Sequence, residues 1–175
     1  MEKIKKDKIA IINMQPCISH QVFEETKTID FRLTPLNDIL LNQKLYVYSS
    51  RKDKAIIGFI RVSRTIYGTI EEIVSETNYN NQDDLKKTIE QFGDKKIYGL
   101  ELYDVTEFDR YLTLDMLRDI NNSFFMKDYI KYINSQNRLY KVITDWDEAF
   151  SLDGSLCKNP DQTAARILGR GKRKR

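Results

Sequence analysis

The order of apolar and polar residues along the chain predicts short strands that alternate with short helices. Residues 44–50 and 54–68 are rich in β-branched and aromatic side chains and are joined by a charged turn, as in a β-hairpin. Gly58, inside the second of these strands, suggests a bulge or a close approach of two backbones. Residues 69–78 and 81–93 instead place their apolar side chains at helical spacing.

The whole pattern indicates an α+β fold. The expected strands span residues 9–14, 26–32, 44–50, 54–68, 96–108 and 138–146, and the last of these segments could also be a helix. The expected helices span residues 16–26, 69–78, 81–93, 113–120 and 123–133. About five or six strands wrapped by short helices favour a small barrel.

Residues 25–32, ETKTIDFR, contain a predicted strand with one polar face. Thr28, Asp30 and Arg32 share that face, because successive side chains of a strand alternate between its two sides. Lys27 stands at the beginning of the strand. The polar face either meets bulk water or lines a pocket for a ligand with hydrogen-bond donors and acceptors.

The composition is that of a soluble globular protein, since 41% of the 175 residues are hydrophobic and 31% are charged. No apolar run approaches the roughly 20 residues that a membrane-spanning helix needs. The first apolar run ends at Asn13, too early for a signal peptide. We therefore expect a cytoplasmic protein with one domain over residues 1–150, helical from about residue 123, and a flexible basic tail over residues 151–175.

The positive net charge comes from the C-terminus. Residues 166–175 hold six basic and no acidic residues, whereas the other residues hold 23 basic and 26 acidic ones and carry a net charge of −3. A short basic tail attracts phosphates through sequence-independent electrostatics. It can equally be a solubilising terminus, so both interpretations stay open.

The cysteine and histidine content argues against a metal site. Cys17, Cys157 and His20 are the only residues of these types, too few for the usual ligand set of zinc. We expect both cysteines to be plain thiols and His20 to be a structural residue of the first helix. No metal and no cofactor is expected.

Several stretches, in the right order, resemble the ASCH family, a branch of the PUA-like β-barrel proteins. They are NMQP at 13–16, ETKTIDFR at 25–32, VYSS at 47–50 and AIIGFIRV at 55–62. Residues 95–117 are similar to a later strand and helix of the family, so that the resemblance covers roughly residues 9–125. It implies a PUA-like small mixed β-barrel of about five to six strands flanked by short helices.

The chain departs from the family pattern in a few places. Glu25 and Thr26 stand where the family has a glycine, and Asp30 stands where it has a glutamate, which shortens the side chain by a methylene. A proline-containing stretch of the family is reduced here to NNSFF, in which Ser123 and Phe124 match.

The resemblance implies a cleft beside the barrel that binds RNA or a modified nucleoside or nucleotide. Arg32 offers planar donors for a phosphate or a base edge, and the hydroxyls and cations of residues 48–52 suit a rim that contacts phosphates. Tyr48 and Phe124 are candidates for stacking on bases. The alternative is a simple Asp30–Arg32 surface pair beside a charged hairpin turn. The candidate binding residues are Lys27, Asp30, Arg32, Tyr48, Ser49, Ser50, Arg51, Lys52, Ser123 and Phe124.

An enzyme on the same cleft and a protein-interaction module are the alternative functions. Relatives of similar fold are amidohydrolases of 4-acetylcytidine that use a strand lysine, which Lys27 matches, but the threonine they also use has no counterpart here. Other relatives cleave single-stranded RNA by acid–base chemistry, for which Lys27, Tyr48 and Ser49 are the candidate catalytic residues. In the interaction module, the helix expected at 123–133 docks on a partner. The sequence leaves the oligomeric state open.

Overall fold

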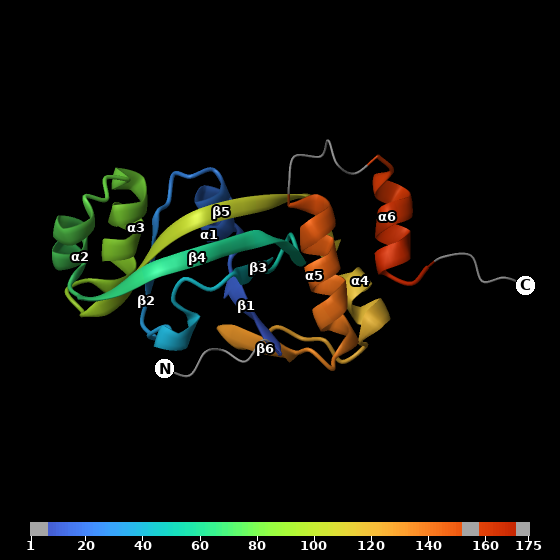
Figure 1. Ribbon diagram of the computed structural model, residues 1–175. Helices are drawn as coiled ribbons and strands as arrows, with labels where there is room; N and C mark the ends of the chain where they lie inside the picture. The colour runs from blue at the N-terminus through green and yellow to red at the C-terminus, as the bar shows by residue number, and fades with distance from the viewer. Residues whose placement is uncertain (1–6, 152–157, 171–175) are drawn as a thin grey trace, which may run out of the picture.

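The computed structural model describes residues 7–151 and 158–170 and contains a six-stranded mixed sheet (Figure 1). The strand order is β2-β5-β4-β3-β1-β6. β1 and β3 are parallel, and the other neighbouring pairs are antiparallel. The strands are β1 (Lys8–Met14), β2 (Ile29–Arg32), β3 (Leu45–Ser49), β4 (Ala55–Gly68), β5 (Ile97–Thr113) and β6 (Ile130–Asn134).

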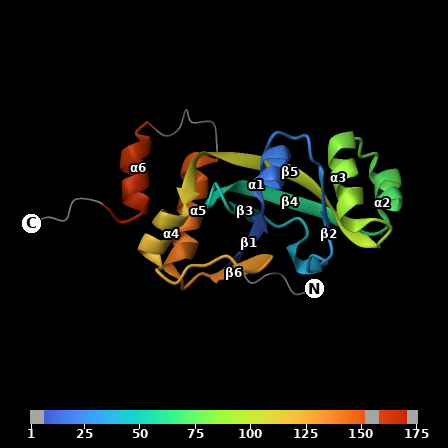
Figure 2. The same ribbon diagram turned by 180° about the vertical axis from the view of Figure 1, so that it is seen from behind.

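Apart from α1, which packs against β3 and β5 near the middle of the sheet, the α-helices gather at the two ends of the long ribbon that β4 and β5 form (Figures 1 and 2). α2 and α3 lie together at one end, and α4, α5 and α6 lie at the other (Figures 1 and 2). A short 3-10 helix, Asp38–Leu40, lies between β2 and β3. The α-helices are α1 (Pro16–Phe23), α2 (Ile70–Thr77), α3 (Gln82–Phe92), α4 (Leu114–Ile120), α5 (Arg138–Phe150) and α6 (Pro160–Ile167).

The α+β class is confirmed, but the predicted barrel is wrong, because the sheet does not close. β2 has only four residues and pairs with β5 alone, while β6 pairs with β1 alone. The β4–β5 ladder shifts its register at several bulges, which increase the twist of a sheet. The sheet curls so far that the side chain of Arg32 in β2 reaches Tyr129, the residue before β6. Side chains, and no backbone ladder, therefore bridge the two ends of the sheet.

Hydrophobic side chains cover both faces of the sheet. Tyr46 and Tyr48 of β3 pack in the cluster that contains Trp146 of α5. Val47, on the alternate side of the same strand, packs in the cluster that contains Val22 of α1. Consecutive residues of β3 thus serve different sides of the molecule.

Over residues 123–146 the expected helix and the expected strand were exchanged. Residues 123–133 were predicted as a helix, but they form a loop followed by β6, which pairs with the edge of β1. For residues 138–146 a strand was favoured over a helix, but they belong to α5. Asn137 caps this helix by accepting a hydrogen bond from the backbone of Leu139, and the buried side chains recur at helical spacing. The buried side chains of α5 are Leu139, Val142, Ile143, Trp146, Asp147 and Phe150.

The flexible tail expected over residues 151–175 is wrong for Pro160–Ile167, which form α6. Ala164 and Leu168 are buried in the same cluster as Trp146, so α6 is part of the folded core. Arg170 is paired with Asp119. Residues 152–157 and 171–175 lie outside the described part of the chain, and the domain boundary at residue 150 stays a prediction.

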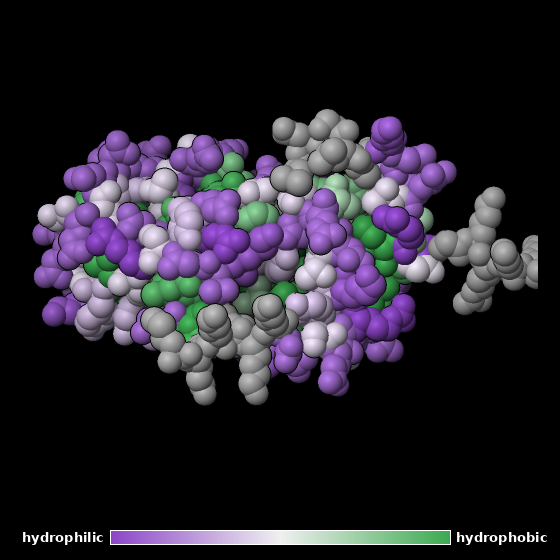
Figure 3. Space-filling view, viewed as in Figure 1, coloured by the Kyte–Doolittle hydropathy of each residue, from purple (hydrophilic) through white to green (hydrophobic). Residues whose placement is uncertain are grey.

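The surface of the described residues is mostly polar. The face in Figure 3 is largely hydrophilic, and its apolar side chains form small patches. Among the helices that the structure describes, none is long and apolar enough to cross a membrane.

Candidate functional site

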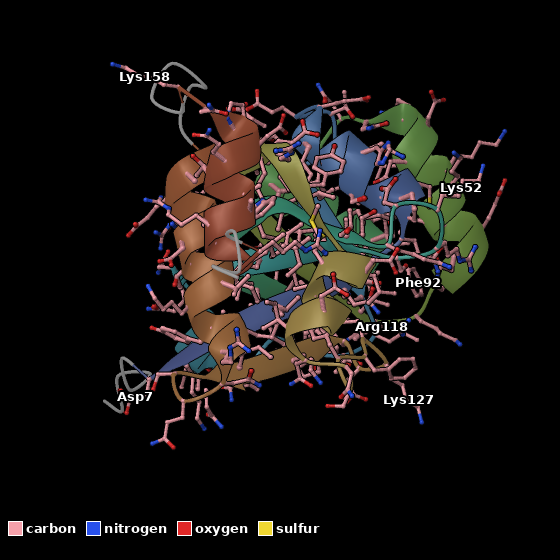
Figure 4. All side chains as sticks on the ribbon, turned by 90° about the vertical axis from the view of Figure 1, so that its right-hand side faces the viewer. Asp7, Lys52, Phe92, Arg118, Lys127 and Lys158 are labelled. Carbon is pink, nitrogen blue, oxygen red and sulfur yellow. The ribbon has the colours of Figure 1, made fainter. Side chains whose placement is uncertain are left out.

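A cavity of about 440 Å³ lies where the end of β2 approaches the end of β1, and we call it the Arg32 cavity. Its walls also include the turn between β3 and β4, the end of α3 and the segment before β6. Figure 4 shows Phe92 of α3 and Lys127 of the segment before β6 on the same side of the molecule. The lining residues are Asn13, Met14, Gln15, Ile18, Asp30, Phe31, Arg32, Leu33, Thr34, Ser50, Arg51, Gln91, Phe92, Lys127 and Tyr129.

Arg32 is held in the wall of this cavity by three neighbours. Its Nε donates to Asp30 Oδ2 at 2.6 Å, and its Nη2 donates to the backbone oxygen of Asn13 at 2.8 Å. Its guanidinium carbon lies 3.9 Å from the centre of the Tyr129 ring, which is a close cation–π contact. Because Asp30 is only 1% exposed, the pair is not the solvated surface pair that the sequence left open. The result is a guanidinium held over the Tyr129 ring at a fixed position.

Two polar atoms of the wall are buried without a hydrogen-bond partner among the described residues. They are Asn13 Oδ1 and the Tyr129 hydroxyl. Burial raises the pKa of Tyr129; Arg32 acts against this shift and Asp30 adds to it. Tyr129 is therefore a neutral phenol that can donate a hydrogen bond. An unsatisfied buried polar group costs about 1–3 kcal/mol, so a ligand that reaches these atoms recovers part of that cost.

The β3–β4 turn places Ser50 and Arg51 at the cavity. Ser50 donates to the backbone oxygen of Met14 twice, from its backbone nitrogen at 2.9 Å and from its hydroxyl at 3.2 Å. Arg51 has φ 55°, in the left-handed region that non-glycine residues seldom adopt. The far side of the turn is fixed by Asp53, which accepts a hydrogen bond from Ser49 at 2.6 Å.

Asp53 also joins Ser49 to His20, but these residues do not form a catalytic triad. Ser49 Oγ and His20 Nε2 both form a hydrogen bond with the same oxygen, Asp53 Oδ2. Ser49 Oγ also lies within hydrogen-bond distance of Ser19 Oγ, at 2.8 Å. A triad needs the imidazole to contact the hydroxyl, whereas here the carboxylate lies between them. Burial raises the pKa of Asp53, but the hydrogen bonds with Ser49 and His20 outweigh burial and lower it. This network stabilises the turn.

Lys27 lies outside the Arg32 cavity. Its side chain is 4% exposed, and its Nζ lies 2.6 Å from Asp84 Oδ2 on α3. Tyr79 donates to the same oxygen at 2.7 Å. The pKa of Tyr79 is raised mainly by burial and, to a lesser extent, by this hydrogen bond. Lys27 thus ties the start of β2 to α3 and is not available to a ligand in the cavity.

Tyr48 and Phe124, the expected stacking residues, belong to the core. Their ring centres are 6.3 Å apart, and they are 6% and 2% exposed. Burial raises the pKa of Tyr48, which Arg118 opposes. Ser123 donates to Asn121 at the surface.

The structure therefore brings some of the predicted residues together and separates others. Asp30, Arg32, Ser50 and Arg51 line one cavity. The proposed catalytic set does not converge, because Lys27, Tyr48 and Ser49 each contact a different group of residues. The candidates outside the cavity are Lys27, Tyr48, Ser49, Lys52, Ser123 and Phe124.

Sequence reasoning missed the residues that distant segments contribute. Phe92 and Gln91 end α3, and Lys127 and Tyr129 precede β6. Tyr129 was assigned to a helical stripe, which hid its position beside Arg32. Asn13, Met14 and Gln15 are the lining residues that the NMQP motif signalled.

No group of three or more His, Cys, Asp and Glu side chains in the described residues is arranged to hold a metal ion. Cys17 is a free, exposed thiol, and Cys157 lies outside the described residues.

The curled, open six-stranded mixed sheet with its helices has the fold of solved ASCH structures. The crystal structure of ASCH from Zymomonas mobilis aligns with a TM-score of 0.61 and 22% sequence identity, over 77% of this chain and 93% of that one. A tyrosine-to-phenylalanine variant of that protein aligns with a TM-score of 0.61 and 21% identity, over 77% of this chain and 96% of its own. A serine-to-alanine variant aligns with a TM-score of 0.62 and 22% identity, over 81% and 98%.

These similarities show that the chain has the ASCH-domain fold, which confirms the structural side of the predicted resemblance. No protein-family model matches the chain, and no curated protein sequence does either.

Proposed function

We propose that this protein binds RNA or a modified nucleotide in the Arg32 cavity. The observation that carries the proposal is the stack of Arg32 on Tyr129, locked by Asp30 in the cavity wall. Sequence-specific RNA recognition uses unstacked bases that lie on aromatic rings or on guanidinium planes. The volume of about 440 Å³ falls within the range of roughly 300–1,000 Å³ that small-molecule sites occupy.

The polar groups of the cavity suit the edge of a base. Gln15 and Gln91 carry amides that both donate and accept, and Asn13 and Tyr129 contribute the two buried atoms without partners in the described part of the chain. A ligand edge with a donor next to an acceptor satisfies such groups. Phe92 adds an apolar side chain to the same lining.

The C-terminal positive charge would add affinity that does not depend on sequence. Six basic residues lie within residues 166–175, although Arg170 is already paired with Asp119. Phosphate contacts of this kind make affinity fall with salt concentration. The six C-terminal basic residues are therefore expected to determine how steeply affinity falls with salt concentration. The cavity is expected to determine which ligand is preferred.

Binding of fluorescein-labelled single-stranded RNA, followed by fluorescence anisotropy, tests the proposal. Arg32→Ala removes the guanidinium plane, and because one base stack is worth about 1–3 kcal/mol, affinity should fall roughly 5- to 150-fold. Arg64→Ala is the matched control, since Arg64 is an exposed arginine paired with Glu101 and does not line the cavity. Its affinity should stay within about twofold of that of the unaltered protein.

Arg32→Ala also leaves Asp30 buried without its charged partner, so the double variant Asp30→Asn with Arg32→Ala is measured beside it. Thermal unfolding checks that each variant is folded. The proposal is wrong if both folded variants bind RNA as the unaltered protein does, while removal of residues 171–175 abolishes binding.

The same samples distinguish a binding protein from a hydrolase. We expect the RNA to stay intact on a denaturing gel and 4-acetylcytidine to keep its acetyl group, because the proposed catalytic residues Lys27, Tyr48 and Ser49 do not converge. Turnover of either compound that Arg32→Ala abolishes would instead favour an enzyme on this cavity.

A further inference from the structure

The charged residues of the Arg32 cavity are divided between a neutral wall and a cationic rim. Asp30 and Arg32 are paired with each other at 2.6 Å, so their charges cancel. Arg51 and Lys127 are the other charged residues of the lining. Neither has an ion pair within the described ranges of the chain. The rim therefore carries two uncompensated positive charges.

The position of Arg51 is maintained against a conformational cost. Its φ of 55° is unfavourable for a residue with a Cβ. The turn keeps this conformation because Ser50 is anchored to Met14 on one side and Asp53 is anchored to Ser49 on the other. Backbone conformations of this kind persist where the surrounding structure enforces them, and they cluster at ligand-binding sites.

We infer that the Arg32 cavity takes a nucleotide through its phosphate as well as its base, and so distinguishes nucleotides from nucleosides. This inference rests on the proposed function. The uncharged base lies against the stack of Arg32 and Tyr129, where no net charge has to be compensated. The phosphate lies between Arg51 and Lys127, which give it charge-assisted hydrogen bonds that a nucleoside cannot form.

Inorganic phosphate and nucleotides share the chemistry that the rim recognises, so the experiment separates them. Isothermal titration calorimetry compares the common ribonucleosides, their 5′- and 3′-monophosphates, and inorganic phosphate alone. At least one monophosphate should bind roughly tenfold or more tightly than its nucleoside. Inorganic phosphate should bind more weakly than that monophosphate, because it lacks the base.

The double variant Arg51→Ala with Lys127→Ala should lose the preference for the monophosphate, so that the ratio of the nucleoside Kd to the monophosphate Kd falls to about one. Lys52→Ala is the matched control, since Lys52 is an exposed cation in the same turn that does not line the cavity. It should keep the preference for the monophosphate. The basic tail is present in every variant, so its nonspecific attraction cancels in the comparison.

The possible failures are distinguishable. Equal binding of nucleosides and monophosphates by the unaltered protein, with both weakened by Arg32→Ala, overturns the phosphate inference and leaves the proposed function standing. A preference that survives in the double variant overturns it as well, as does inorganic phosphate binding as tightly as the monophosphates. If no nucleoside, nucleotide or RNA binds, the proposed function fails and the inference fails with it.

Discussion

The buried ion pair between Lys27 and Asp84 allows a sharp test of how this fold is held together. The two side chains are 4% and 9% exposed, and their charged atoms lie 2.6 Å apart. Lys27→Met removes the charge but keeps an unbranched apolar stem. Asp84 is then left as a buried carboxylate whose remaining side-chain donor is the hydroxyl of Tyr79, at 2.7 Å. The substitution therefore isolates the cost of an uncompensated buried charge.

The expected loss of unfolding free energy is about 3 kcal/mol. Breaking a buried pair by removing one partner costs about 3–5 kcal/mol, and the Tyr79 hydrogen bond that remains places the value at the lower end. For a protein of 175 residues, each kcal/mol lowers Tm by about 2–4 °C, so Tm should fall by about 6–12 °C. RNA affinity at a temperature where the variant is folded should be unchanged, because Lys27 does not line the Arg32 cavity.

Urea unfolding followed by circular dichroism at pH 7 measures this loss. Lys52→Met, at an exposed position, should change stability by less than about 0.5 kcal/mol. Lys27→Met with Asp84→Asn should recover at least half of the loss, because the variant no longer buries a charge. A loss below about 1 kcal/mol for Lys27→Met alone would refute the reasoning. So would full stability combined with loss of RNA binding or turnover, which would make Lys27 a functional residue after all.

The remaining predictions concern the β3–β4 hairpin and the sheet. The hydrogen bonds with Ser49 and His20 outweigh burial and lower the pKa of Asp53, so its stabilising contribution is complete above the ordinary value of 3.8 and is lost as pH falls through the lower folded value. In urea unfolding, the stability difference between the unaltered protein and Asp53→Asn should narrow as pH falls from about 5 toward 2; a constant difference would contradict this. Gly58→Ala would place a Cβ 2.2 Å from the backbone oxygen of Thr106, which cannot move aside without disrupting the ladder. The expected loss is about 2 kcal/mol or more by the same assay, and an unchanged midpoint would show that β4 and β5 separate easily.

Much of the fold could be predicted because local patterns decided it. Residues 44–50 and 54–68 carry β-branched and aromatic residues throughout, and both became strands close to the expected bounds. The exchange of helix and strand over residues 123–146 arose from short apolar runs that fit both periods. The signal that separates them is Asn137, whose side chain caps α5. The strand character of β6 is decided by the free edge of β1, which no local pattern reveals.

The candidate site was predictable only on the segment where its residues are adjacent in sequence. Asp30 and Arg32 are two residues apart in β2, so the alternation of side chains along a strand placed both on the same face. Both line the cavity. Lys27 lies before the start of β2 and does not line the cavity, and its partner Asp84 is 57 residues away in the chain. Tyr129 reaches Arg32 from the far end of the sheet. The Arg32–Tyr129 contact follows from the curl of the sheet, and neither contact can be predicted from one stretch of sequence.

The position of the cavity follows from the way in which the barrel fails to close. In a closed barrel, backbone hydrogen bonds between β2 and β6 would fill the space between the two end strands. Here β2 is too short to form that ladder, and Arg32 bridges the seam instead, donating to the backbone oxygen of Asn13 and stacking on Tyr129. A side-chain bridge leaves room that a ladder would not, and it leaves polar groups facing that room. Arg32 therefore holds the two ends of the sheet in place and also presents the surface that we propose contacts a base, so substitutions at this position should alter ligand binding and the stability of the seam together.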